Sequence, residues 1–200
     1  MLKWILGILA LIIVVVAGTC YYGFKKLTGD GGTVTITMAG TPERIFAALA
    51  SPDSMVLWMS SSQIEAPLGK GLLAAGDTLR LRQSATKGDS ASQMNGTFAG
   101  DWVVREVNAP TLLVMEMVED SAGTRRVVLI RRDSLAAAGD STTLVTTFSS
   151  PMLDSLSTAV RDSSKVGSSV LSGASKIMLG AMRLGAEAEL KLLKARVEGK

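Results

Sequence analysis

The chain has 200 residues, which suits one ordinary domain and an appendage. Its formal net charge is only +3, and its basic residues occur as scattered pairs without interleaved aromatics, so the charge pattern does not indicate nucleic-acid binding. The chain has no histidine and one cysteine, which excludes His-dependent catalytic triads, His-containing metal sites and an internal disulfide. A disulfide-free domain can lie on either side of a membrane, so the compartment stays open.

The N-terminus carries a long uncharged segment, WILGILALIIVVVAGTCYY, at residues 4–22. A spanning helix needs about 20 apolar residues, and this run has that length. Lysines flank it, and aromatic residues stand at both ends, where their rings favour the headgroup layer. We therefore predict a single-pass transmembrane anchor with its flank at residues 1–27, followed by a flexible linker at 28–32 (TGDGG).

Two other interpretations of this segment remain open. A cleaved signal peptide has an apolar core of about 7–15 residues, which is shorter than this run, so a retained anchor is preferred. A lipoprotein signal would end at Cys20, but Thr19 is a poor last residue before such a cysteine. Lys3 on one side opposes Lys25 and Lys26 on the other, so the charges barely set the orientation. We expect the soluble domain outside the cytoplasm.

The soluble part begins with a strand and two short helices. Residues 33–38 alternate between Thr and apolar residues, which is typical of a half-buried strand. Thr41 is a suitable N-cap, with Pro42 at the first helical position. Pro52 disfavours helix in the residue before it and should separate this helix from a second one that carries Trp58.

The pattern is β-rich from there to about residue 149. Turn residues separate the candidate strands at spacings that favour antiparallel hairpins. These candidates are Gln63–Ala66, Asp77–Gln83, Asp101–Val107, Leu112–Val118, Arg125–Arg132 and Thr143–Ser149.

The sequence pattern after Pro151 is typical of a helix. We predict a long C-terminal helix over about 152–197, weak in its Ser-rich first part and stronger from Ala174. Its apolar stripe is expected to contain Ile177, Met178, Ala181, Leu184, Gly185, Ala188 and Leu192. Gly180 and Gly185 each cost the helix about 1 kcal/mol relative to Ala. Their presence is therefore better explained by close packing than by local helix preference.

This order of elements resembles the START-like (SRPBCC, polyketide cyclase or Bet v 1-like) helix-grip domains. The resemblance rests on TVTITMAGTPERIFAALASPDSMVLWM at residues 33–59 and GDWVVREVNAPTLLVMEM at residues 100–117. It implies an α+β domain at 33–198, in which a curved antiparallel sheet of about seven strands and two short helices grip the long C-terminal helix. It also implies a deep apolar cavity between sheet and helix, suited to hydrophobic ligands. These motifs are structural and contain no catalytic signature.

Seven apolar side chains are candidates to line such a cavity, although ordinary core packing is the competing interpretation for each. They are Trp58, Phe98, Trp102, Met115, Met117, Phe148 and Met178. A carboxylate of Glu65, Glu106 or Glu116 that faced the cavity could act as an acid or base, but solvent-facing positions are the commoner outcome. The acidic residues at 101–120 lack the spacing of a calcium loop. We expect no catalytic residue, metal or cofactor.

The leading functional hypothesis is a membrane-anchored START-like domain that binds a hydrophobic or lipid-like small molecule without catalysis. Its expected partners are the membrane and that molecule, with no nucleic acid; the sequence identifies no protein partner. One alternative is an enzyme of the cyclase or dehydrase type that uses a cavity carboxylate. Another is an interaction scaffold that uses the small-residue face of Gly180, Ala181, Gly185 and Ala188 on the C-terminal helix.

Overall fold

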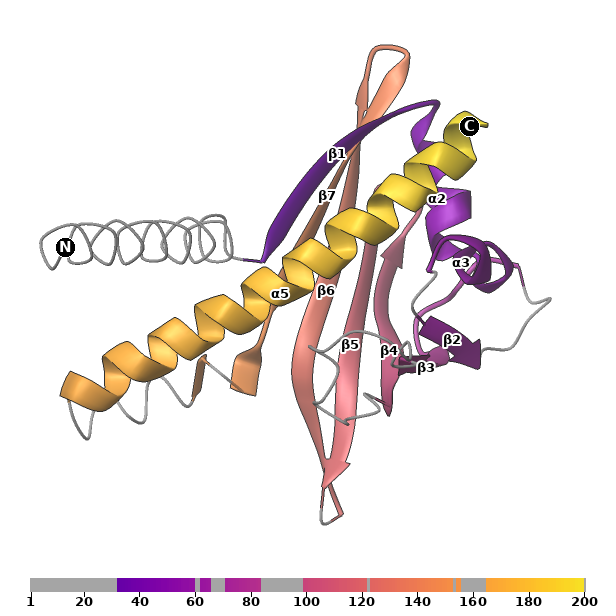
Figure 1. The fold of residues 1–200 in the computed structure, drawn as a ribbon. Coiled ribbons are helices and arrows are strands. Elements are labelled where there is room, and N and C mark those ends of the chain that lie inside the picture. The colour runs from indigo at the N-terminus through magenta and orange to yellow at the C-terminus, as the bar shows by residue number, and fades with distance from the viewer. Residues whose placement is uncertain are drawn as a thin grey trace, which may run out of the picture.

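The computed structural model describes residues 32–59, 62–65, 71–83, 99–121, 123–152, 154–155 and 165–199. Within them one antiparallel sheet and two short helices surround a long C-terminal helix (Figure 1). No helix in these ranges combines the length and hydropathy that crossing a bilayer requires. The predicted anchor at 1–27 lies outside the described residues, as does the linker up to residue 31.

The sheet has seven strands in the order β1-β7-β6-β5-β4-β3-β2, and every neighbouring pair is antiparallel. This arrangement confirms the prediction of an antiparallel sheet of about seven strands, and it leaves β1 and β2 at the edges. The strands are β1 (Thr33–Ala39), β2 (Ser62–Glu65), β3 (Thr78–Gln83), β4 (Ala99–Asn108), β5 (Leu112–Ser121), β6 (Thr124–Ala138) and β7 (Ser141–Ser149).

The two short helices begin at the prolines that the sequence indicated. Helix α2 spans Pro42–Ala50 and α3 spans Pro52–Trp58, each with its proline in the first turn, where a missing N–H costs no hydrogen bond. Helix α2 buries Ile45, Phe46 and Leu49 against the core. Both helices therefore lie over one end of the sheet and close the core there (Figure 1).

Helix α5 spans Lys165–Glu198. The predicted start near residue 152 stays a prediction, because residues 151–152 and 154–155 are helical and residues 156–164 lie outside the described residues. The predicted apolar stripe is wrong in phase, because Ile177 and Leu192 are each 43% exposed and a Cβ on Gly185 would meet open space. The buried stripe is instead Ala186, Leu190, Leu193 and Val197.

The inner face of the sheet, which packs against α2, α3 and α5, forms the core. It presents alternate residues of each strand, as the period of two requires. The described core cluster includes Met38, Leu79, Val104, Leu113, Met115, Leu135 and Leu144 from the sheet and Leu190 and Leu193 from α5. The space under the C-terminal half of α5 is therefore filled by side chains.

Candidate functional site

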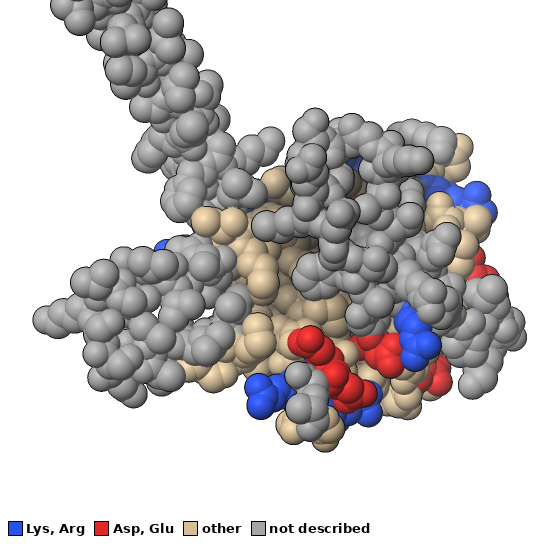
Figure 2. Space-filling model, turned by 60° about the horizontal axis from the view of Figure 1, so that its bottom comes forward, with Lys and Arg blue, Asp and Glu red and all other residues tan. Residues whose placement is uncertain are grey.

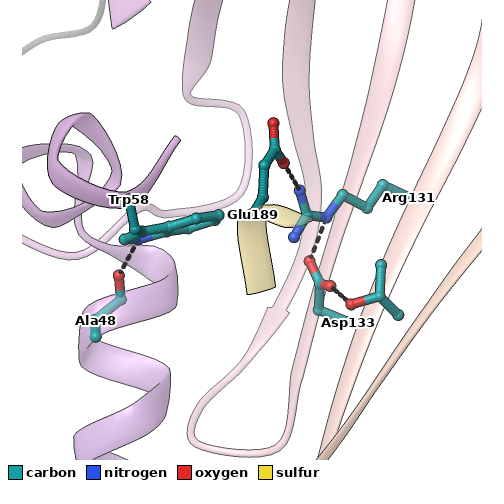
Figure 3. Close-up of polar contacts among 6 residues, drawn as sticks. Ala48, Trp58, Arg131, Asp133 and Glu189 are labelled. Atoms are coloured by element: carbon teal, nitrogen blue, oxygen red, sulfur yellow. Dashed lines mark hydrogen bonds and ion pairs between the residues drawn. The ribbon is translucent and has the colours of Figure 1, made fainter. Parts of the chain in front are cut away.

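Two charged side chains lie on the inner face of the sheet, in the middle of the apolar core. Arg131 and Asp133 are on β6 with exposures of 4% and 0%, between Leu129 and Leu135 on the same face. The Arg131 Nε donates a hydrogen bond of 2.9 Å to the Asp133 carboxylate. Buried charges are costly unless they are paired, and this pair satisfies that condition (Figure 3).

Neighbouring elements complete the pairing. Thr146 on β7 lies directly across from Asp133, and its hydroxyl donates to the second carboxylate oxygen. Glu189 of α5 approaches from the helix side, with its carboxylate 3.9 Å from the Arg131 Nη1. Three elements, β6, β7 and α5, are thus joined by one buried polar cluster (Figure 3).

Two aromatic rings enclose the guanidinium. Its central carbon lies 5.9 Å from the ring centroid of Trp58 and 6.0 Å from that of Phe148, distances at which a cation is attracted to an aromatic face. The Trp58 indole N–H donates to the Ala48 carbonyl at 3.0 Å, which fixes the ring between α2 and the sheet (Figure 3). The cation therefore has a rigid position.

Arg131 carries its charge at every accessible pH. Burial acts to lower its pKa, but attraction to Asp133 and Glu189 and the hydrogen bond to Asp133 outweigh burial, so the pKa lies above its usual range. The Nη2 atom is buried and has no hydrogen-bond acceptor among the described residues. Within the cluster, the one positive charge of Arg131 faces the two carboxylates of Asp133 and Glu189.

The inner face changes from buried to half-exposed along three strands. On β5, Leu113 and Met115 are 0% and 3% exposed, and the next inward residue, Met117, is partly exposed. On β4 the same step leads from Val104 to Trp102, which pairs with Met117.

On β7 the step leads from Thr146, which is fully buried, to Phe148, which is only half-buried. We call the surface formed by Trp102, Met117 and Phe148 the open apolar face. It adjoins the polar cluster, because Phe148 pairs with Arg131 across the strands. In Figure 2, uncharged surface (tan) occupies the middle of the view, and acidic and basic side chains (red and blue) lie below it.

The structure divides six of the seven predicted cavity residues into two groups. Trp58 and Met115 belong to the filled core, so for them the core interpretation holds. Four are partly exposed: Trp102, Met117, Phe148 and Met178. Phe98 lies outside the described residues.

The candidate acids do not face the interior where they are described. Glu106 is exposed, and Glu116 lies on the outer face of β5, 3.9 Å from the Arg105 Nε. The side chain of Glu65 is outside the described part. The described residues also contain no group of three acidic, histidine or cysteine side chains that could hold a metal ion.

Sequence reasoning missed the polar cluster, although β6 carried a signal for it. The alternation Leu129, Arg131, Asp133, Leu135 places two charges on the same face as two apolar residues. The predicted strand Arg125–Arg132 ends one residue before Asp133, whereas β6 continues to Ala138.

An antiparallel seven-stranded sheet that holds one long C-terminal helix, with two short helices after the first strand, is the helix-grip fold of the START-like (SRPBCC) proteins. Solved structures share this fold, and three of them illustrate the similarity to this chain. The Aha1 dimer from Colwellia psychrerythraea is 14% identical, with 83% of this chain and 94% of that chain covered and a TM-score of 0.52. Protein Ms6760 from Mycobacterium smegmatis is 15% identical, with 84% of this chain and 90% of that chain covered and a TM-score of 0.52. A protein from Arthrobacter aurescens is 11% identical, with 84% of this chain and 86% of that chain covered and a TM-score of 0.53.

At these identities the likeness concerns the fold alone. No protein-family model matches the sequence, and no curated protein matches it.

Proposed function

We propose that this START-like domain binds a lipid-like small molecule on the open apolar face. The observation that carries the proposal is the step from buried to half-exposed at Trp102, Met117 and Phe148, which leaves large apolar side chains partly uncovered on the inner face. Ligand sites are mostly apolar and concave, with few polar groups. Aromatic and Met side chains suit them, since Met adapts its shape to different apolar ligands.

In this proposal the polar end of the ligand lies at the polar cluster. The Arg131 Nη2 is a buried donor without an acceptor among the described residues, and the central carbon of its guanidinium lies 6.0 Å from the ring centroid of Phe148. A neutral acceptor such as a hydroxyl or carbonyl oxygen would satisfy it. The formal charge of −1 on the cluster disfavours a carboxylate or phosphate at the same place.

The predicted anchor places this surface near a source of such molecules. Residues 4–22 have the length and hydropathy of a spanning helix, and residues 23–32 separate them from β1. A domain tethered in this way would exchange its ligand with the adjacent bilayer. The proposed role is therefore to hold a lipid-like molecule close to the membrane, without catalysis.

Substituting Met117 with lysine should weaken ligand binding at least tenfold, because the substitution places a charge on the open apolar face. The full chain in lipid nanodiscs is titrated with an anthracene-labelled fatty alcohol. Energy transfer from tryptophan is measured, with empty nanodiscs subtracted. The matched control is Val118→Lys, since Val118 is the next residue on β5 and faces the opposite side of the sheet.

Equal binding by Met117→Lys and Val118→Lys would contradict the site, and no saturable binding by the unmodified chain would contradict the function. The corresponding labelled fatty acid tests the head group. It should bind more weakly than the alcohol, because of the negative formal charge beside Arg131.

A further inference from the structure

The edge strand β1 offers backbone groups that face away from the sheet. Its even-numbered residues hydrogen-bond to β7, as the bonds from the Phe148 N–H to the Gly32 carbonyl and from the Gly40 N–H to the Asp140 carbonyl show. The N–H and C=O groups of the odd-numbered residues therefore point outward. Exposed strand edges of this kind can pair with another strand.

Helix α5 covers one half of this edge. It runs alongside β1 (Figure 1), and in its last turns Lys194 donates to the Thr37 carbonyl at 2.7 Å. Glu198 accepts from the Ala39 N–H at 3.1 Å. Both outward positions in the second half of β1 are thus bonded by side chains of α5.

In the first half of the edge, no described residue bonds to the outward backbone groups of Thr33 and Thr35. A groove of about 640 Å³ lies there between β1 and α5. It is lined by Thr33, Val34, Thr35 and Ile36 from the strand and by Arg183, Glu187 and Lys191 from the helix. The three helix residues are spaced by four, so they share one face. Lys191 bonds to Glu187 at 2.8 Å instead of reaching the strand.

We propose that this groove accepts an extended peptide segment as an eighth strand on β1, with an acidic side chain toward α5. Thr33 and Thr35 are both exposed, and each presents an outward N–H and C=O. Two such residues lie about 7 Å apart along a strand. That is the repeat at which an added strand forms its hydrogen bonds, so the edge provides up to four backbone bonds to one peptide.

The lining favours a peptide over a lipid-like ligand. The strand wall carries regularly spaced donors and acceptors, and the helix wall is entirely charged. An acyl chain cannot hydrogen-bond to the strand wall or pair with the charges of the helix wall. A peptide backbone can hydrogen-bond to the strand wall, and peptide side chains can pair with the charges of the helix wall. Only Val34 and Ile36 give apolar contact from the inner side of β1.

The charges of the helix wall give the preference for an acidic peptide. Arg183 and Lys191 carry two positive charges against one negative charge on Glu187, a net of +1. Lys191 is the more accessible cation, with 67% of its side chain exposed. An acidic residue facing α5 would gain attraction there, and the gain should fall with added salt.

Peptide addition is tested with the full chain in lipid nanodiscs and a fluorescein-labelled probe of sequence Thr-Val-Glu-Val-Thr. Fluorescence anisotropy should show saturable binding, and hydrogen exchange should show protection of the backbone amides at residues 33–36 when the probe is bound. A probe with a central lysine in place of the glutamate should bind severalfold more weakly at low salt.

The decisive variant is Thr35→Pro, which removes an outward N–H but keeps the ladder to β7, because Thr35 does not donate to that strand. Binding should weaken at least tenfold, through a lost hydrogen bond and the bulk of the ring at the edge. Thr37→Pro is the matched control: it makes the same change where α5 already covers the edge, and should alter binding less than twofold. Thr35→Val keeps the N–H and should bind as the unmodified chain does.

Circular dichroism and the urea midpoint establish that each variant is folded before binding is compared. Absence of saturable probe binding to the unmodified chain would overturn the proposal. So would equal losses in Thr35→Pro and Thr37→Pro, or a Thr35→Val variant that loses binding.

Discussion

Replacing Asp133 with alanine is expected to destabilise the domain by about 3–5 kcal/mol. The carboxylate is fully buried and bonds to both Arg131 and Thr146, so its removal leaves the guanidinium without its closest counter-charge and the hydroxyl without an acceptor. Domains are stable by about 5–15 kcal/mol, so a loss of this size takes a large share of the total. Urea titration of the full chain, followed by circular dichroism, measures it.

A double variant distinguishes loss of a charge partner from loss of packing. Arg131→Met combined with Asp133→Leu removes both charges at similar volume, and well-packed apolar replacements of buried ion pairs are often neutral. The double variant should therefore be clearly more stable than Asp133→Ala alone. A double variant as unstable as the single one would show that the pairing is not what Asp133 contributes.

Replacing Trp58 with alanine should cost about 3–5 kcal/mol, the range for large-to-small changes at buried aromatic positions. The ring is fully buried, donates to the Ala48 carbonyl and lies beside the Arg131 guanidinium. Its loss would leave a cavity between α3 and the polar cluster. The change in unfolding free energy is again measured by urea titration.

The neighbouring residue supplies the control for this substitution. Leu57 precedes Trp58 on α3 and is 57% exposed, so Leu57→Ala should change stability by less than about 0.5 kcal/mol. A cost for Leu57→Ala comparable to that for Trp58→Ala would contradict the burial pattern of α3.

The fold could be predicted from the sequence wherever local signals agreed with tertiary packing. The Thr-rich alternation of residues 33–38 gave β1, because an edge strand with one buried face keeps a strict period of two. Pro42 and Pro52 gave the starts of α2 and α3, because proline fits only the first turn of a helix. The resemblance to helix-grip domains added an antiparallel sheet of about seven strands that grips the C-terminal helix.

The face of α5 could not be predicted in the same way. Charged residues divide the apolar residues of its second half into two separate stripes, and the sequence pattern does not choose between them. Packing against β1 and α2 selects the stripe that contains Leu190 and Leu193. The charges on that side, such as Glu189, obscured it, because a carboxylate next to the core is interpretable only once Arg131 is known to lie opposite.

The residues of the open apolar face could be predicted by type, but their exposure could not. Trp102, Met117 and Phe148 were identified by residue type, but so were Trp58 and Met115, which belong to the core. Residue type alone does not tell an exposed inner-face position from a buried one. That distinction depends on where α5 crosses the sheet, which is a property of the whole fold.

The contacts of Lys194 and Glu198 with β1 have a consequence for the carboxyl end of the chain. They hold the last turns of α5 against the strand, together with a bond from Arg44 to the Val197 carbonyl. Trimming by a carboxypeptidase that removed residues 194–200 would uncover Thr37 and Ala39. The accessible stretch of β1 would then double, from two outward-facing residues to four, and the proposed peptide site would accept a longer strand.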